Sequence, residues 1–122
     1  MLKQYNKNDL NEQNKYGHTL VHIFFTSENI EFIKILLNDI RIDCDIQDYK
    51  GITTLHIAIL KNNIEITNLL LNDKRINPNK QDINWYTGFY LACSKKYTEI
   101  IKILLNDERI DINKQDNVCN KW

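Results

Sequence analysis

The sequence predicts an all-α protein, a solenoid of stacked helix–turn–helix units joined by hairpin-like loops. A pattern of 34 residues occurs three times, so that Thr19 recurs as Thr53 and Thr87. Each copy holds two short apolar runs with helical spacing, separated by a turn. Each copy then ends in a polar connector that closes with Gln-Asp. A fixed period between 20 and 50 residues is the sequence signature of stacked repeats.

The first unit opens with a tight turn at residues 14–17, where Gly17 supplies a permissive backbone. Thr19 is the expected N-cap, because its hydroxyl can accept from an unpaired backbone N–H of the next turn. A first helix is predicted over residues 20–26. Residues 27–29 end it, and a second helix follows over residues 30–38, with its apolar side chains at spacings of three and four.

The second and third units repeat these signals. Thr53 and Thr87 are the expected caps, and Asn62-Asn63 forms a turn in which Asn tolerates the left-handed region. Four more helices are predicted, over residues 54–61 and 64–72, from Thr87 to about residue 95, and over residues 98–106.

The repeat boundaries divide the chain into a sequence of similar units. We expect a partial N-terminal connector whose own helices are absent or degenerate, then three full repeats, then the opening of a truncated fourth. Their ranges are 1–12, 13–47, 48–81, 82–115 and 116–122. A single two-helix unit buries too little surface to fold alone, so its stability depends on its neighbours.

Composition excludes several classes of protein. Lys plus Arg and Asp plus Glu are both 16 in 122 residues, which argues against the basic face of a nucleic-acid-binding protein. The three cysteines form no CxxC motif, which favours a reducing, intracellular and cytoplasmic location. No apolar run is long enough to span a membrane, and the N-terminus lacks the apolar core of a signal peptide.

The stretch GITTLHIA at residues 51–58, followed by Glu65 and by Leu69 to Leu71, closely resembles the ankyrin repeat. The resemblance covers residues 13–116. It implies an ankyrin-type solenoid that binds a partner protein without chemistry or cofactor of its own. It also implies that His22 and His56 are structural, bonding to the local Thr and to neighbouring backbone, instead of binding metal or catalysing a reaction.

Three departures from the family pattern matter. Phe24 stands where Ala58 and Ala92 stand in the other units, which is tolerable if the first unit covers an open end. Tyr90 replaces the histidine in the third unit. Trp85 occupies the glycine position of the third turn, and we expect that turn to be reshaped, because Trp lacks the backbone freedom of Gly.

Recurrent charges have structural interpretations. The glutamates Glu31, Glu65 and Glu99 complement helix N-termini, and the aspartates Asp48, Asp82 and Asp116 cap turns. A solvated face is expected for the arginines that alternate with aspartates in the connectors, Arg41, Arg75 and Arg109. His18 is expected to be a solvated turn residue. Since no catalytic motif occurs in the sequence, we predict no enzyme.

Positions that do not recur are the candidate partner-binding residues. In the family, the turn tips and the ends of the first helices line a concave surface, and here they combine aromatic and basic side chains suited to binding hot spots. The predicted residues are Tyr16, His18, Tyr49, Lys50, Ile52, Leu60, Lys61, Ile83, Asn84, Trp85, Tyr86, Ser94 and Lys95. The alternative for Trp85 and Tyr86 is that they fold back onto their own turn.

Two other functions stay open. The chain is also compatible with a targeting or regulatory segment of a larger protein, such as a kinase or a ubiquitin-ligase adaptor, with self-association or further repeats at uncapped ends. Asn79 and Asn113 occupy the connector position that is hydroxylated in some similar repeats, which makes the protein a candidate modification substrate.

Overall fold

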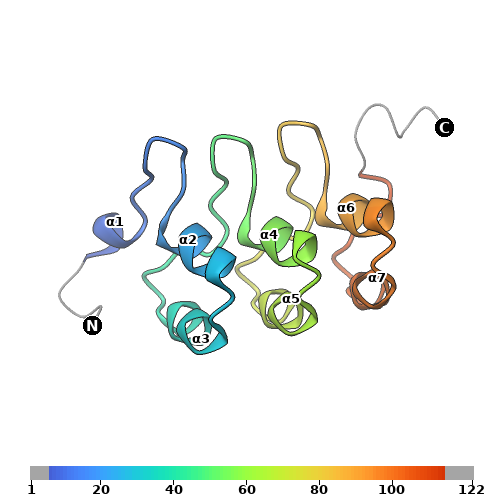
Figure 1. The fold of residues 1–122 in the computed structure, drawn as a ribbon, viewed down its shortest axis with the longest axis horizontal. Helices are drawn as coiled ribbons and strands as arrows, with labels where there is room; N and C mark the ends of the chain where they lie inside the picture. Colours follow the sequence, from blue (N-terminus) through green and yellow to red (C-terminus); the bar gives the residue numbers. More distant parts are fainter. Residues whose placement is uncertain (1–5, 115–122) are drawn as a thin grey trace.

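A computed structural model describes residues 6–114 and shows three pairs of antiparallel helices stacked side by side (Figure 1). The helices are α1 (Lys7–Leu10), α2 (Leu20–Ser27), α3 (Ile30–Asn38), α4 (Thr54–Leu60), α5 (Ile64–Leu71), α6 (Gly88–Lys95) and α7 (Thr98–Leu105). No strand occurs between residues 6 and 114. The predicted all-α solenoid is therefore confirmed, and the six predicted helices begin and end within one residue of their expected bounds.

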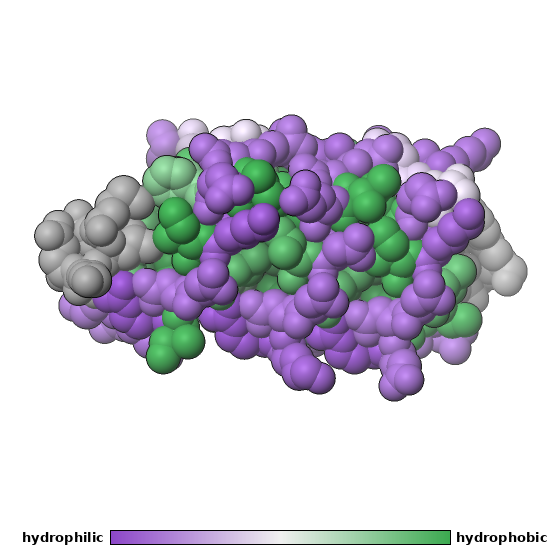
Figure 2. Space-filling view, turned by 90° about the horizontal axis from the view of Figure 1, so that it is seen from below, coloured by the Kyte–Doolittle hydropathy of each residue, from purple (hydrophilic) through white to green (hydrophobic). Residues whose placement is uncertain are grey.

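The helices form two rows. The first helices of the repeats, α2, α4 and α6, make one row, and the second helices, α3, α5 and α7, make the other (Figure 1). The extended turns project from the first row on the side away from the second row. Figure 2 shows that the outer face of the second row is mostly hydrophilic, with hydrophobic side chains exposed between the polar ones.

Local sequence explains why each helix begins where it does. The hydroxyl of Thr53 accepts from the N–H of His56 at 3.2 Å, and that of Thr87 accepts from Tyr90 at 3.1 Å. Asn63 caps α5 by accepting from the N–H of Ile66 at 3.0 Å. These caps satisfy donors that the first turn of a helix leaves unpaired.

The turn between the two helices of a repeat uses the same backbone each time. Glu28, Asn62 and Lys96 all have left-handed backbone, with φ of 58°, 52° and 59°. Only Asn62 has a side chain that favours this region. The packing of the two helices therefore imposes the conformation on Glu28 and Lys96.

The core lies between the two rows and continues from one repeat to the next. Leu36, Leu70 and Leu104, which are equivalent in the three repeats, are fully buried. Ala58 and Ala92 are also buried, which lets successive first helices approach closely. Phe24 replaces alanine at the N-terminal side of this row, where it is half-buried and stacked on Phe32, with ring centroids 4.6 Å apart.

The N-terminal segment is more ordered than its sequence indicates. Residues 7–10 form one helical turn capped by Asn6, and Leu10 is buried in the core. Asn11 joins the segment to the first repeat, because its amide donates to the Arg41 carbonyl at 2.8 Å. Of the two alternatives, absent or degenerate helices, the described part of the segment has one degenerate helix of four residues. The predicted opening of a fourth repeat, at residues 116–122, lies outside the described residues.

Candidate functional surface

Three turn tips, at residues 14–18, 48–52 and 82–86, project from the solenoid (Figure 1). In the second tip, one carboxylate oxygen of Asp48 accepts from the N–H groups of Lys50 and Ile52, both at 2.9 Å. Asn14 and Asp82 make the equivalent pairs of bonds in the other tips. The predicted turn-capping role of Asp48 and Asp82 is therefore confirmed by the hydrogen bonds.

Backbone and glutamine contacts tie each tip to the next. The N–H of Tyr49 donates to the Tyr16 carbonyl at 3.1 Å, and the N–H of Ile83 donates to the Lys50 carbonyl at 2.9 Å. The amide of Gln47 donates both within its own tip and to the Gln81 carbonyl in the next. The tips thus present their side chains from a fixed backbone, which reduces the entropy lost on binding.

Glycine is required in the first two tips for two separate reasons. Gly17 and Gly51 have φ of 81° and 77°, in the left-handed region that side chains disfavour. In addition, a Cβ atom on Gly17 would lie 2.5 Å from the backbone nitrogen of Tyr49. One on Gly51 would lie 2.7 Å from the Cα atom of Asp82. Each glycine therefore accommodates the following tip.

Trp85 adopts the same conformation without being glycine. Its φ is 70°, and its N–H donates to the Asp82 carbonyl at 2.9 Å. The N–H of Gly51 donates to the Asp48 carbonyl at the same distance. The prediction of a reshaped third turn was wrong, because the capping bonds of Asp82 hold the turn against the preference of the side chain. A bulky residue with positive φ is a rare and strained arrangement.

The structure divides the predicted partner-binding residues into two groups. Trp85 is 55% exposed, and nine further residues of the set are exposed with it: Tyr16, Tyr49, Lys50, Leu60, Lys61, Ile83, Asn84, Ser94 and Lys95. The remaining three are half-buried and hold their tips together. The ring of Tyr86 stacks on Tyr90 with centroids 4.3 Å apart, and Ile52 accepts a hydrogen bond through its carbonyl. His18 is not simply solvated, because its Nε2 lies 3.2 Å from an Asp48 carboxylate oxygen.

The buried histidines link adjacent repeats. Nδ1 of His56 accepts from the N–H of Thr53 at 3.1 Å, and Nε2 contacts the Tyr86 carbonyl at 3.0 Å. A backbone N–H can only donate and a carbonyl can only accept, so the ring is neutral with its proton on Nε2. Burial lowers the pKa of His56 below 6.5. His22 repeats these contacts toward Thr19 and Ile52, which confirms the predicted bonding of both histidines to the local Thr and to neighbouring backbone.

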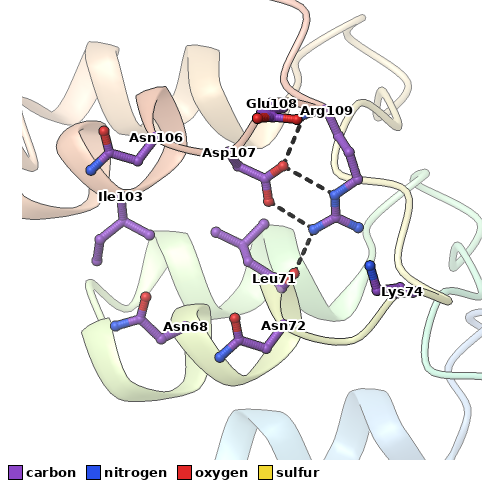
Figure 3. Close-up of a pocket in the computed structure, with 9 residues that line it drawn as sticks. All are labelled: Asn68, Leu71, Asn72, Lys74, Ile103, Asn106, Asp107, Glu108 and Arg109. Carbon is purple, nitrogen blue, oxygen red and sulfur yellow. Dashed lines mark hydrogen bonds and ion pairs between the residues drawn. The ribbon is translucent and has the colours of Figure 1, made fainter.

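The arginines have a role that the sequence interpretation missed. Arg109 forms a two-bonded ion pair with Asp107 and donates to the carbonyl of Leu71 in the preceding repeat (Figure 3). It also donates to the Ile76 carbonyl of that repeat. Arg75 makes the same bonds to Asp73, Leu37 and Ile42. Arg75 and Arg109, which were expected on a solvated face, therefore form an inter-repeat clamp. Its signal in the sequence was the recurrence of Asp-x-Arg-Ile in all three full repeats.

A groove with mixed polar and apolar lining lies beside each clamp, on the second-row side of the solenoid. One groove is lined by Asn68, Leu71, Asn72, Lys74, Ile103, Asn106, Asp107, Glu108 and Arg109 (Figure 3). Another lies one repeat earlier and is lined largely by the residues 34 positions before them, including Lys34, Leu37 and Asn38. Because the groove recurs with the repeat, it follows from helix stacking and does not mark one specific site.

No constellation suited to chemistry occurs among residues 6–114. No group of three or more His, Cys, Asp or Glu side chains there could hold a metal ion. Burial raises the pKa of the Cys44 thiol to about 12, which leaves it unreactive at neutral pH. In the same part of the chain, no helix has the length and apolar character needed to cross a bilayer.

The stacked helix pairs and projecting tips define this chain as a helical repeat protein. Family models for ankyrin repeats match it twice, over residues 1–82 with a model of three copies and over residues 69–120 with a model of many copies. The protein belongs to the ankyrin-repeat family, whose members are generally protein–protein interaction modules and typically non-catalytic. A search of curated proteins found no match.

Proposed function

We propose that this protein binds a partner protein through a surface formed by the tips and the ends of the first helices, with Trp85 as its central anchor. We call the ten exposed residues named above the tip surface. Fold membership alone does not select a site. The observation that carries the proposal is the strained, exposed Trp85 at a position where the other two repeats have glycine.

The backbone strain at Trp85 favours a functional explanation for this residue over a structural one. Glycine would hold the same turn without strain, as Gly17 and Gly51 do. Trp85 shares its tip with exposed Ile83, and the preceding tip carries exposed Tyr49. Together these side chains supply the large apolar contact area that interface hot spots use. Tyr86 has a different role in this proposal: its ring stacks on Tyr90 and supports the tip from within.

The test compares two variants that each remove one exposed apolar side chain. Immobilised wild-type protein, Trp85→Gly and Ile40→Ala are used to capture proteins from a cell extract, and captured proteins are quantified by mass spectrometry. Ile40 is 91% exposed on a connector, outside the tip surface. We expect Trp85→Gly to lose a partner that wild type and Ile40→Ala retain. Equal capture by all three would contradict the proposal.

The wider setting is part of the same proposal. Cys44 and Cys93 are free thiols, which supports an intracellular location. A role as a targeting or regulatory segment of a larger protein is compatible with binding through the tips. Hydroxylation of Asn79 or Asn113 stays a prediction, tested by a mass increase of one oxygen. At Asn79 the connector would have to open for this reaction. The side-chain amide of Asn79 donates to the Arg109 carbonyl at 2.7 Å and accepts from the N–H of Asp111 at 2.8 Å.

A further inference from the structure

Lysines gather on the side of the solenoid that carries the tips. Lys15 and Lys50 lie on tips, and three more lie at the ends of first helices: Lys61, Lys95 and Lys96. All five are exposed, and none forms an ion pair with another residue between 6 and 114. Lys15 instead has its ammonium nitrogen 5.1 Å from the centre of the Tyr16 ring.

Negative charge on this side is sparse and partly hidden. Glu12 is exposed beside the first tip, and Glu28 is exposed at the end of α2. The Asp48 side chain is only 6% exposed, and Asp82 is half-buried with one oxygen bonded to its own turn. The second helices differ, because Glu31, Glu65 and Glu99 are exposed beside Lys34 and Lys102. In a chain with zero net charge, the exposed charge on the tip side is therefore mostly positive.

We propose that the tip surface receives an acidic segment of the partner, with apolar side chains that contact Trp85 and Ile83 and carboxylates that face the lysines. This inference rests on the proposed function and adds the chemistry of the partner. These five ammonium groups form no ion pair with the described residues and lie on the same side of the solenoid as the exposed aromatic side chains. They create a field that attracts carboxylates and rejects basic segments. A single-stranded nucleic acid would also meet lysines and aromatic rings, and the test separates the two.

The experiment selects binders from a displayed library of random twelve-residue peptides, using immobilised wild-type protein. Trp85→Gly and the triple variant Lys50→Glu/Lys61→Glu/Lys95→Glu serve as counter-targets. We expect peptides enriched in Asp and Glu that fail to bind either variant. Selected peptides that need Trp85 but show no acidic enrichment would overturn this inference and leave the proposed function standing. A selection that yields no Trp85-dependent peptide would overturn both.

Affinity measurements then use the most enriched peptide. The triple tip-side variant is expected to weaken its binding by about tenfold or more at low salt. The matched triple variant Lys34→Glu/Lys74→Glu/Lys102→Glu, with the same change of charge on the opposite side, is expected to change it less than about twofold. Displacement of the peptide by a single-stranded twelve-nucleotide RNA at comparable concentration would contradict an acidic protein partner and assign the surface to nucleic acid.

Discussion

The guanidinium Nη2 of Arg75 lies 2.7 Å from the carbonyl oxygen of Leu37, near the C-terminus of α3 in the preceding repeat. That carbonyl is one of the four that a helix leaves unpaired at its end, and a cation there also complements the helix dipole. Asp73 holds the guanidinium in position from the other side, at 2.6 Å. One side chain thus couples the two repeats.

Replacing Arg75 with lysine is expected to destabilise the protein. Lysine cannot bond two carbonyls and a carboxylate in the fixed geometry of a guanidinium, so about 1–3 kcal/mol of unfolding free energy should be lost. Urea denaturation followed by circular dichroism measures it. The neighbouring exposed Lys74 provides the control, since Lys74→Ala should change stability by less than about 0.5 kcal/mol. Equal effects of the two variants would show that the clamp contributes nothing.

Asp45 occupies a position where the equivalent residues of the neighbouring units are asparagines. Asn11 and Asn79 each accept from one backbone N–H of the next connector and donate to a carbonyl there, at 2.8 and 2.7 Å. Asp45 accepts from the N–H of Asn77 at 3.0 Å, but its buried Oδ1 has no hydrogen-bond partner among the described residues. The ammonium nitrogen of Lys80 lies 3.0 Å from Oδ2 of Asp45 and offsets part of the buried charge.

Asp45→Asn is therefore expected to raise stability at neutral pH by about 1 kcal/mol, because an amide restores the missing donor. Asn79→Asp makes the reverse change at the equivalent position and should lower stability by a similar amount. Both are measured by denaturant midpoint. If Asp45→Asn proved destabilising, the ion pair with Lys80 would outweigh the missing hydrogen bond.

Stability is expected to fall as the solution becomes acidic, starting near pH 6.5. Burial lowers the pKa of His22 and His56 below 6.5 in the folded protein. Between the folded and unfolded pKa values the unfolded chain binds more protons, so unfolding is favoured as pH drops. The histidine contribution is fully present above pH 6.5 and levels off below the folded pKa. Urea midpoints measured from pH 7.5 to 5 should show this loss.

A variant with His22→Gln and His56→Gln provides the comparison for this pH dependence. It should be less stable at pH 7.5 but should lose less of its remaining stability on acidification, since glutamine does not titrate. His18 remains in both proteins and so does not distinguish them. Parallel pH profiles would show that the buried histidines are not responsible.

Opposite outcomes are expected for two substitutions at equivalent turn positions. Gly51→Ala places a Cβ atom 2.7 Å from the Cα atom of Asp82 and strains a left-handed backbone, so it should cost about 2 kcal/mol or more. Trp85→Gly relieves the same backbone strain and should raise stability by up to about 1 kcal/mol. Thermal denaturation of both variants tests this. A loss of stability in Trp85→Gly would mean that the indole packs more tightly than its exposure indicates.

The amino-acid sequence by itself determined the helices, their caps and the repeat. These depend on contacts between residues a few positions apart, such as Thr53 with His56, and on a spacing that recurs along the chain. The same reasoning correctly placed the tips and identified Trp85 as the unusual residue. The resemblance to the ankyrin repeat also implied that His22 and His56 bond to the local Thr and to neighbouring backbone, as the hydrogen bonds show.

Only the tertiary structure decided which contacts join one repeat to the next. Arg75 reaches Leu37 across 38 positions, and the backbone beside Gly51 belongs to Asp82 in the next tip. No local propensity encodes these distances, since they follow from how the helix pairs stack. For the same reason Trp85 takes a backbone that its residue type disfavours: the bonds to Asp82 fix the turn, and the side chain must follow.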